Sequence, residues 1–537
     1  MSTAQLLGLS LISALLLWLG WPTYGFPALL FVAFVPLLLV ERSIRVESKK
    51  ARGWKVLGLA YLTFVLWNYA TTGWLYNSTA FGMFFAVLVN SLLMALVFWV
   101  YHLFARRSTT GASLTFLVCL WIAFEWMHLH WEFSWPWLNL GNGFSEHTSW
   151  IQWYEYTGTF GGSLWIWLVN VVVFLSVLRF RQSKNPASLS RMLKAIALPL
   201  FLIASPLLVS LLIAQQELKS IGQVDVVILQ PNVDPYDEKY DLENTEFVSR
   251  LSDLLPDPAS YNPDFIIAPE TVLSRSIELS RVPYDRSLNQ LKNLTAQYDD
   301  ASFLGGVSLI DRFREENRVK RQTNYYAAGR FYYDDYNSAF FLSGNRATEL
   351  YHKSKLVVGV ENFPYKGILQ PILGDAMIDL GGTVATKTTQ EERSVFKSND
   401  SIAVAPIICY ESVYGDYVGD YVNNGAQFLA IITNDAWWDN TQGHQQHLSL
   451  ARLRAVETRR SIARSANTGI SAIIDPMGTI QQSLGYEKRG SIKGTIDLYD
   501  KITFYNTHGD YIARLASVLG LFTLLFAIFK RGKMKRK

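Results

Sequence analysis

Apolar stretches on both sides of a long polar block are the feature that most limits how this chain can fold. About 20 apolar residues are needed to cross the roughly 30 Å hydrocarbon core of a bilayer. Seven such stretches precede the block and one follows it, at residues 6–21, 27–40, 56–75, 81–104, 114–130, 164–178, 195–214 and 511–529. The pattern predicts a bundle of about eight transmembrane helices. Seven of them fall in residues 1–214, a polar domain occupies 215–510, and residues 511–537 form a last helix with a basic cytoplasmic tail.

Basic residues gather in alternate loops and predict the orientation of the chain. They are Arg42, Arg45, Lys49, Lys50, Arg52, Lys55, Arg106, Arg107, Arg179, Arg181, Lys184, Arg191, Lys194, Lys530, Arg531, Lys533, Lys535, Arg536 and Lys537. Because Lys and Arg are enriched in cytoplasmic loops, both termini are expected inside and the polar block outside. The loop over 131–162 has no Lys or Arg and is rich in Trp and Tyr, which is typical of a membrane interface. The first stretch lacks the basic flank and cleavage pattern of a signal peptide, so we expect it to remain as a span.

The polar block has the pattern of an α/β domain. Short apolar runs predict strands, several of them without a solvated face, at 224–230, 265–270, 302–309, 338–343, 402–409, 428–433 and 470–475. Residues 445–463 predict a helix that turns Leu448, Ala451, Ala455, Val456 and Ile462 toward a core. Sheets that are buried on both faces need helices to cover them, so the sequence predicts an α/β sandwich.

Glu270, Lys353 and Cys409 are the candidate catalytic residues of this domain. Cys409 ends the apolar run over 402–409, Glu270 ends the run over 265–270, and Lys353 lies beyond the strand-like residues 350–352. A carboxylate can accept a thiol proton, and an ammonium can stabilise both a thiolate and a developing oxyanion. The three residue types together indicate a site for nucleophilic acyl transfer.

Each of these residues also has a simpler interpretation. A cysteine at a strand end is often a small buried packing residue, and Lys355 competes with Lys353 for the lysine role. Cys119, the second of the two cysteines, lies in an apolar stretch and is expected either to face lipid or to pack in the core. An outer domain with one cysteine has no internal disulfide, so a free thiol retained in an oxidising compartment favours a functional role.

The motifs that contain these residues resemble those of the nitrilase, or carbon–nitrogen hydrolase, superfamily. The matching segments are Ile-Ile-Ala-Pro-Glu at 266–270, Tyr-His-Lys at 351–353 with Glu361 eight residues on, Ile-Cys-Tyr-Glu at 408–411, and Thr-Asn-Asp-Ala-Trp-Trp at 433–438. Together with the flanking spans, and with Trp-Pro-Trp-Leu-Asn-Leu-Gly at 135–141, the whole chain is similar to the apolipoprotein N-acyltransferases. Residues 357–364 depart from the family's usual Pro-Phe-Gly-Glu-Tyr run but keep the glutamate and the following proline.

The resemblance implies a fold, a reaction and a location. The fold is a nitrilase-like αββα sandwich on a polytopic helical bundle, with Glu270 as base, Cys409 as nucleophile and Lys353 as the stabilising cation. Tyr410, through its backbone N–H, would help bind the oxyanion, while Glu361 and Glu411 would orient Lys353 and the base. The acyl donor would be a phosphatidylethanolamine-like phospholipid and the acceptor a diacylated apolipoprotein. The expected site is the periplasmic side of a bacterial inner membrane, with no cofactor.

Other residues have weaker assignments. Trp437, Trp438, Phe363 and Tyr365 are candidates for contacts with acyl chains, with core packing as the alternative. His444 and His447 are spaced like helix-borne metal ligands but lack a third ligand of matching spacing, so no metal is expected. The net charge of +4 is small and lies largely in the cytoplasmic loops, which argues against nucleic-acid binding.

Two rival functions are open at this stage. One is a membrane-tethered amidase with a small soluble substrate, because the three catalytic residues alone do not decide whether water or an amine is the acceptor. The other is a non-catalytic scaffold or transporter that binds lipoproteins. Against a transport path, the spans show no paired charges except the isolated Glu125 and His128.

Overall fold

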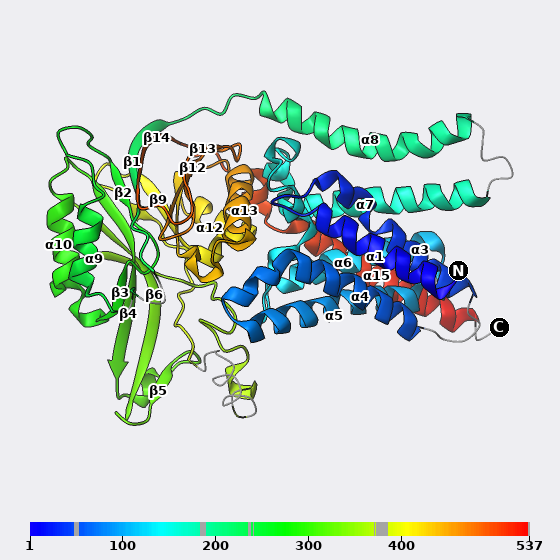
Figure 1. Ribbon diagram of the computed structural model, residues 1–537, viewed down its shortest axis with the longest axis horizontal. Helices are drawn as coiled ribbons and strands as arrows, with labels where there is room; N and C mark the ends of the chain where they lie inside the picture. Colours follow the sequence, from blue (N-terminus) through cyan, green and yellow to red (C-terminus); the bar gives the residue numbers. More distant parts are fainter. Residues whose placement is uncertain are drawn as a thin grey trace. The chain divides into compact units, whose positions relative to one another are not determined.

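The computed structural model describes residues 1–47, 53–182, 189–234, 238–239, 241–369, 371 and 385–534 (Figure 1). It divides into two compact units. The first contains residues 1–76, 80–216 and 508–537, and the second contains residues 77–79 and 217–507. Of the basic residues that predict the orientation, Lys49, Lys50, Arg52, Lys184, Lys535, Arg536 and Lys537 lie outside the described residues.

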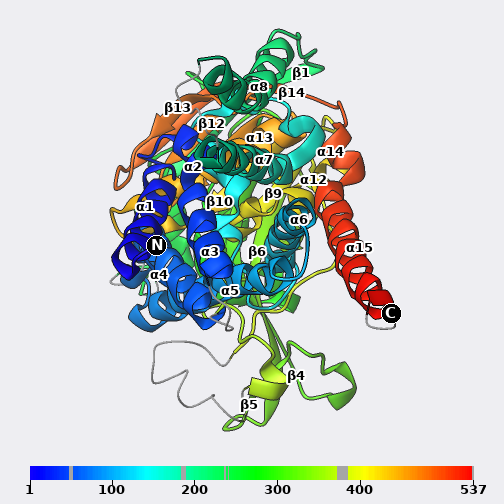
Figure 2. The same cartoon turned by 90° about the vertical axis from the view of Figure 1, so that its right-hand side faces the viewer.

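The first unit is a bundle of helices, several of which Figure 2 shows nearly end-on. A helix occupies each of the eight predicted spans, the second span being divided between α2 and α3. The helices are α1 (Thr3–Leu19), α2 (Leu30–Ala33), α3 (Val35–Glu47), α4 (Gly53–Thr72), α5 (Ala80–Ala105), α6 (Thr110–His128), α7 (Tyr154–Gln182), α8 (Leu189–Ala214) and α15 (Tyr511–Met534). Within the described residues, six segments are long and apolar enough to cross a membrane; α1 and α4 are not among them. This chain is therefore a membrane protein.

The Trp-rich loop between α6 and α7 is folded into this unit. Its Trp137 is 2% exposed, and Tyr154, at the start of α7, is fully buried. Glu125 of α6 fastens the loop, because its carboxylate accepts hydrogen bonds from the Leu140 N–H at 2.8 Å and the Ser163 hydroxyl at 2.6 Å. Buried carboxylates are stabilised by such donors, so Glu125 has a structural role here and offers no support for a transport path.

The second unit contains two β-sheets. The eight-stranded sheet has the order β14-β1-β2-β4-β6-β5, with β3 paired to β4 and β7 paired to β6. Its strands are β1 (Gly222–Gln230), β2 (Phe265–Ile267), β3 (Leu273–Glu278), β4 (Ser302–Phe313), β5 (Asn324–Tyr326), β6 (Phe331–Ser343), β7 (Glu349–His352) and β14 (Gly490–Leu498). The six-stranded sheet has the order β13-β12-β11-β10-β9-β8. Its strands are β8 (Phe396–Lys397), β9 (Ala403–Ile408), β10 (Phe428–Thr433), β11 (Ile462–Ala466), β12 (Ser471–Ile474) and β13 (Ile480–Leu484).

The two sheets pack face to face between two layers of helices, which gives the αββα sandwich. Phe265 of β2 meets Phe428 of β10 edge-on, with ring centroids 5.0 Å apart. The Ser465 hydroxyl of β11 donates to the Leu229 carbonyl of β1 at 2.7 Å. In Figure 1, α9 (Asn244–Ser252) and α10 (Arg286–Thr295) cover the first sheet, while α12 (Gly415–Asn423) and α13 (Gln442–Thr458) cover the second. Strands with no solvated face follow from this burial on both sides.

A strand occurs in each of the seven predicted runs, but the predicted helix over 445–463 is wrong at its end. α13 stops at Thr458, and Arg459 then adopts a left-handed conformation with φ 51°. The chain turns there and enters β11, so Ile462 lies on a strand and not on the helix. The apolar residues on both sides of the turn hide the boundary, because a short buried strand and a buried helix end have the same composition.

Parallel pairing brings the ends of particular strands together. β1, β2 and β4 run parallel in one sheet, and β9, β10 and β11 run parallel in the other. The carboxyl ends of parallel strands meet at one edge of a sheet, where open α/β folds place their ligands. Glu270 and Cys409 follow β2 and β9 at these edges.

Replacing Phe265 with alanine should destabilise the sandwich, because this fully buried ring lies between the two sheets. A buried Phe-to-Ala change costs about 3–5 kcal/mol, which corresponds to a fall of roughly 5–15 °C in the thermal midpoint. The measurement is thermal unfolding of the detergent-solubilised protein. Tyr284→Ala is the control, since that side chain is 84% exposed and should shift the midpoint by less than about 2 °C. Equal shifts in the two variants would contradict the packing described.

Candidate active site

Glu270 lies in a tightly constrained turn just after β2. Thr271, the next residue, has φ 47°, a left-handed conformation that a β-branched residue rarely adopts. Gly306 of β4 packs directly beneath this turn: a Cβ on Gly306 would lie 2.2 Å from the Thr271 nitrogen and 2.6 Å from the Glu270 Cα. The Gly306 N–H also donates to the Pro269 carbonyl at 3.0 Å. Any side chain at position 306 would clash with this turn, so the glycine is what allows Glu270 to take this position.

Lys353 is buried between two carboxylates. Its Nζ lies 3.1 Å from Glu270 Oε1 and 2.9 Å from Glu361 Oε2. Asn337 of β6 joins the same group, because its Nδ2 donates to Glu270 Oε1 and to Glu361 Oε1, each at 2.8 Å. Lys355 is placed elsewhere, with its Nζ 4.7 Å from the centre of the Tyr414 ring. The structure therefore brings Lys353, and not Lys355, to Glu270.

The charged groups around Lys353 shift one another's pKa values. Burial disfavours the ammonium of Lys353, but the charges of Glu270 and Glu361 outweigh that effect and raise its pKa well above the ordinary value. Burial likewise opposes the charge of Glu361, yet the ammonium of Lys353 and the Val357 N–H hold the pKa of this carboxyl below its ordinary value. Lys353 and Glu361 are thus both ionised across the neutral range.

Cys409 directly follows β9 and is the first residue of a short 3-10 segment, Cys409–Val413. Its backbone is strained. Its φ is 51°, and its backbone carbonyl accepts hydrogen bonds from Ser412 Oγ at 2.7 Å and from His447 Nε2 at 3.2 Å. Burial and the negative charge of Glu270 raise the pKa of the Cys409 thiol, while Lys353 acts in the opposite direction. The thiol is neutral at rest, so its ionisation requires a base.

Glu411 links the segments that carry the other candidate residues. Its carboxylate accepts hydrogen bonds from the Ile408 N–H at 2.8 Å, just before Cys409, and from the Ser354 N–H at 2.7 Å, just after Lys353. The hydroxyls of Tyr351 and Tyr417 also contact it, at 2.7 and 2.5 Å. Burial raises the pKa of Glu411 despite these donors. Tyr410, whose backbone N–H is the predicted oxyanion donor, is buried beside it.

His447 belongs to a second buried network beneath Cys409. Its Nδ1 lies 2.9 Å from Asp435 Oδ1, and Arg464 Nη2 lies 2.5 Å from Asp435 Oδ2. Burial opposes the charge of Asp435, but Arg464 and His447 hold its pKa below the ordinary value. Cys409, Asp435 and His447 bring potential metal-ligand atoms within 4.8 Å of one another. His444 does not share this group, since its ring stacks on Tyr486 with centroids 4.3 Å apart.

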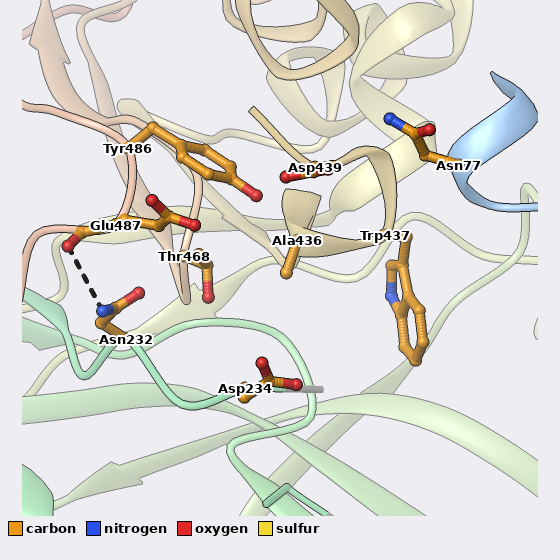
Figure 3. A pocket seen from close by; sticks show the side chains of 9 residues that line it. All are labelled: Asn77, Asn232, Asp234, Ala436, Trp437, Asp439, Thr468, Tyr486 and Glu487. Carbon is orange, nitrogen blue, oxygen red and sulfur yellow. Dashed lines mark hydrogen bonds between the residues drawn. The ribbon is translucent and has the colours of Figure 1, made fainter. Parts of the chain in front are cut away.

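The aromatic candidates occupy different environments. Phe363 is 2% exposed, and Trp438 packs edge-on against His447 with ring centroids 5.4 Å apart. Trp437 lines a hollow of about 520 Å³ beside the loop that follows β10. Figure 3 shows the residues around this hollow, which include three carboxylates: Asn77, Asn232, Asp234, Ala436, Trp437, Asp439, Thr468, Tyr486 and Glu487.

Sequence reasoning missed several residues of the site. The sequence gives only a weak indication that Asn337 belongs to the site, because it is a polar residue just before the apolar run over 338–343. Asn434, whose backbone N–H donates to Glu270 Oε2 at 3.1 Å, was identified only as part of a motif. Lys239 gave no signal, because its charged surroundings, Asp-Glu-Lys-Tyr-Asp, are typical of a solvated turn. In the structure its side chain is buried against the Glu270–Thr271 turn.

The Glu361→Gln variant should be less stable near neutral pH and less sensitive to acid than the wild type. A lost hydrogen bond between charged groups costs about 1.5–3 kcal/mol. Because the folded-state pKa of Glu361 is lowered, its contribution is present above about pH 4.3 and is lost as the pH falls through the folded value. The raised pKa of Lys353 keeps its contribution up to about pH 10.4 and beyond.

Thermal midpoints at pH 7 and pH 4 test this expectation. The gap between wild type and variant should narrow at pH 4. Glu243→Gln is the matched control, because Glu243 forms an exposed pair with Arg275 and its loss should change little at either pH. A gap for Glu361→Gln that is the same at both pH values would show that the charge of Glu361 does not support the fold.

Comparisons with known proteins agree with this architecture. The model of the apolipoprotein N-acyltransferase N-terminal domain matches residues 13–172, and that of carbon-nitrogen hydrolases matches residues 204–502. The apolipoprotein N-acyltransferase of Chlorobaculum tepidum is 28% identical and covers 97% of each chain. That of Geobacter metallireducens is 27% identical and covers 97% of this chain and 95% of its own. Among solved structures, an amidase from Nesterenkonia sp. matches 52% of this chain and 91% of its own at 14% identity and a TM-score of 0.36.

The second family model alone covers more than half of the chain, and the full-length relatives share both of its parts. The chain therefore belongs to the carbon–nitrogen hydrolase family and, within it, to the membrane enzymes that are apolipoprotein N-acyltransferases.

Proposed function

We propose that this enzyme transfers an acyl chain from a phospholipid to Cys409 and then to the N-terminal amine of a diacylglyceryl-cysteine lipoprotein. One observation supports the proposal: Lys353 forms a buried ion pair with Glu270, and both groups act electrostatically on the Cys409 thiol. Full-length similarity to apolipoprotein N-acyltransferases supports the choice of substrates. The acyl donor is a phospholipid of the phosphatidylethanolamine type.

In the first step Glu270 takes the proton of the Cys409 thiol, and the thiolate attacks the carbonyl carbon of the donor ester. The carbon–oxygen bond of that ester then breaks, and the lysophospholipid alkoxide leaves with the proton held by Glu270. The acyl group remains on Cys409 as a thioester. A base is needed because burial and Glu270 raise the pKa of the resting thiol.

Lys353 acts as a fixed positive charge in this scheme. Its raised pKa keeps it protonated throughout, so it stabilises the thiolate and the tetrahedral oxyanion without exchanging a proton. The backbone N–H of Tyr410 is the second donor to the oxyanion. A well-placed donor of this kind contributes about 3 kcal/mol, or roughly two orders of magnitude in rate.

In the second step the lipoprotein amine attacks the thioester carbonyl. Glu270 accepts a proton from the amine, the carbon–sulfur bond breaks, and Cys409 leaves as a thiolate that recovers its proton. The product is an amide on the lipoprotein N-terminus. A thioester suits this step because it is activated toward amines.

A membrane-embedded bundle fits these substrates, since both are held in lipid by their acyl chains. Removing a chain from the bilayer costs about 0.8 kcal/mol for each CH₂ group. We place the catalytic unit on the periplasmic side of a bacterial inner membrane, because the positive-inside rule puts the loops rich in Lys and Arg in the cytoplasm.

The central prediction is that phospholipid alone loads the enzyme. A thioester should accumulate on Cys409, release about one lysophospholipid per enzyme, and be removed by hydroxylamine. A diacylated lipopeptide with a free N-terminal amine should discharge it. Intact-mass analysis of the full chain measures both events. An N-acetylated lipopeptide should leave the adduct in place, because an amide nitrogen is a poor nucleophile.

Variants assign the roles in the same assay. Cys409→Ser, Glu270→Gln and Lys353→Ala should each reduce loading by at least about a hundredfold, because they remove the nucleophile, the base and the cation. Cys119→Ser should load normally. Rapid discharge by water without lipopeptide would favour a membrane-tethered amidase, and no adduct under any condition would favour a scaffold.

A topology measurement tests the location independently. A reporter fused after Gly222 should be active in the compartment outside the cytoplasm, and one fused after Lys537 should be active inside. The reason is the excess of Lys and Arg in alternate loops. Paired alkaline phosphatase and green fluorescent protein fusions give opposite signals in the two compartments. A cytoplasmic signal after Gly222 would exclude the proposed lipoprotein substrate.

A further inference from the structure

Lys239 is a buried charged residue that the proposed mechanism does not use. It lies beyond β1, and its side chain reaches the turn after β2: Nζ lies 3.3 Å from the Glu270 carbonyl oxygen and 2.5 Å from Thr271 Oγ1. Only 1% of Lys239 is exposed. Burying an ammonium costs free energy unless charged or polar partners compensate for the lost hydration. The position of Lys239 beside Glu270 therefore indicates a specific role.

The backbone around Lys239 holds the side chain in this place. The Lys239 N–H donates to the Asp234 carbonyl at 2.8 Å, and the Lys239 carbonyl accepts from Ser274 Oγ at 2.7 Å. The neighbouring Glu238 is partly exposed and pairs with Arg250 at 2.8 Å. Among the residues that the structure describes, the negative groups that act on Lys239 are Glu270 and, once ionised, Cys409.

A count of charges shows what Lys239 supplies. Among the described residues, the two carboxylates that pair with Lys353, Glu270 and Glu361, contribute two negative charges, and Lys353 contributes one positive charge. Asp435 of the second network also acts on Cys409, but its negative charge is compensated by its own partner, Arg464. A second cation therefore makes the group around Glu270 neutral while the thiol is protonated. It remains neutral when the proton moves from Cys409 to Glu270.

We propose that Lys239 is a positioning residue of the active site, which holds the Glu270–Thr271 turn and supplies a second positive charge that favours the Cys409 thiolate. This deepens the proposed function, because it rests on Cys409 being the nucleophile. The left-handed Thr271 is the residue whose side chain Lys239 contacts, so the same ammonium that adds charge also secures the strained turn.

The charge of Lys239 changes with pH near neutrality. Burial lowers its pKa to about 8, although Glu270 and Cys409 act in the opposite direction. Lys239 is therefore charged below about pH 8 and becomes neutral above it. Its help to the thiolate should be complete near pH 6–7 and fade as the pH rises through 8–9. Lys353 differs, because its pKa is raised and its charge persists.

Alkylation of Cys409 tests this without lipid or lipoprotein. The full chain carries Cys119→Ser in all samples, and the rate of iodoacetamide modification is followed by intact mass between pH 6 and 9.5. Below the thiol pKa, this rate is proportional to the thiolate fraction, and one pKa unit changes it tenfold. Lys239→Gln keeps a hydrogen-bond donor and removes the charge, and Lys239→Arg keeps the charge at all pH values. Lys292→Gln removes a partly exposed lysine of α10 as the control.

The expected result is a specific pH profile. The ratio of the wild-type rate to the Lys239→Gln rate should be about tenfold at pH 6–7 and approach one above pH 9. Lys239→Arg should match the wild type at pH 6–7 and exceed it above pH 9, and Lys292→Gln should match it throughout. A purely structural role would change the rates by a factor independent of pH.

Other outcomes overturn the proposal. A Lys239→Gln rate equal to the wild type at pH 6–7, or a ratio constant with pH, would show that the charge does not act on the thiol. If Lys239→Gln does not yield folded protein, Lys239→Arg decides: a tenfold slower rate at pH 6–7 overturns the proposal, and a wild-type rate there with a faster rate above pH 9 supports it. The alkylation rates can be measured even if the protein transfers no acyl chain. The experiment can therefore contradict the role of Lys239 without contradicting the proposed function, and the reverse also holds.

Discussion

The ion pair that Lys353 makes with Glu270 and Glu361 is the interaction on which the candidate site depends. All three groups are largely removed from water, and a buried charge is tolerated only when its partners compensate for lost hydration. Lys353 also acts on Cys409, where its positive charge opposes the rise in the pKa of the thiol. Low-dielectric surroundings then strengthen the effect of each fixed charge on the reacting atoms.

Strained backbone occurs at two positions of the candidate site, Cys409 and the residue after Glu270. Cys409 and Thr271 both have left-handed φ values, which cost of order 1–3 kcal/mol each in residues with a side chain. Both turns are held by the surrounding structure. Ser412 and His447 bind the carbonyl of Cys409, and Gly306 leaves space for the turn at Thr271 while Lys239 contacts its hydroxyl. These contacts belong to different strands and helices, so the fold as a whole supports the geometry.

Glu411 connects the two segments that carry the candidate residues Cys409 and Lys353. It is hydrogen-bonded to the residue before Cys409, on the six-stranded sheet, and to the residue after Lys353, beyond the eight-stranded sheet. Its pKa is raised by burial, and tyrosine hydroxyls complete its hydrogen bonding. Glu411 therefore acts as a brace between the two segments, whereas Glu361 contributes charge directly to Lys353. The sequence alone predicts the same role for Glu361 and Glu411, which is to orient Lys353 and the base.

Hydrophobic patterning was sufficient to predict the membrane helices, the strands of the sandwich, and the strand ends that carry Glu270 and Cys409. Patterning is local, because apolar runs of a given length and period report burial at their own positions. It did not determine where α13 ends, since apolar residues continue across the turn into β11. It also did not separate Lys353 from Lys355, or reveal Asn337 and Lys239. Those assignments depend on which side chains meet across two sheets, at separations of tens of residues, and only the tertiary structure decides them.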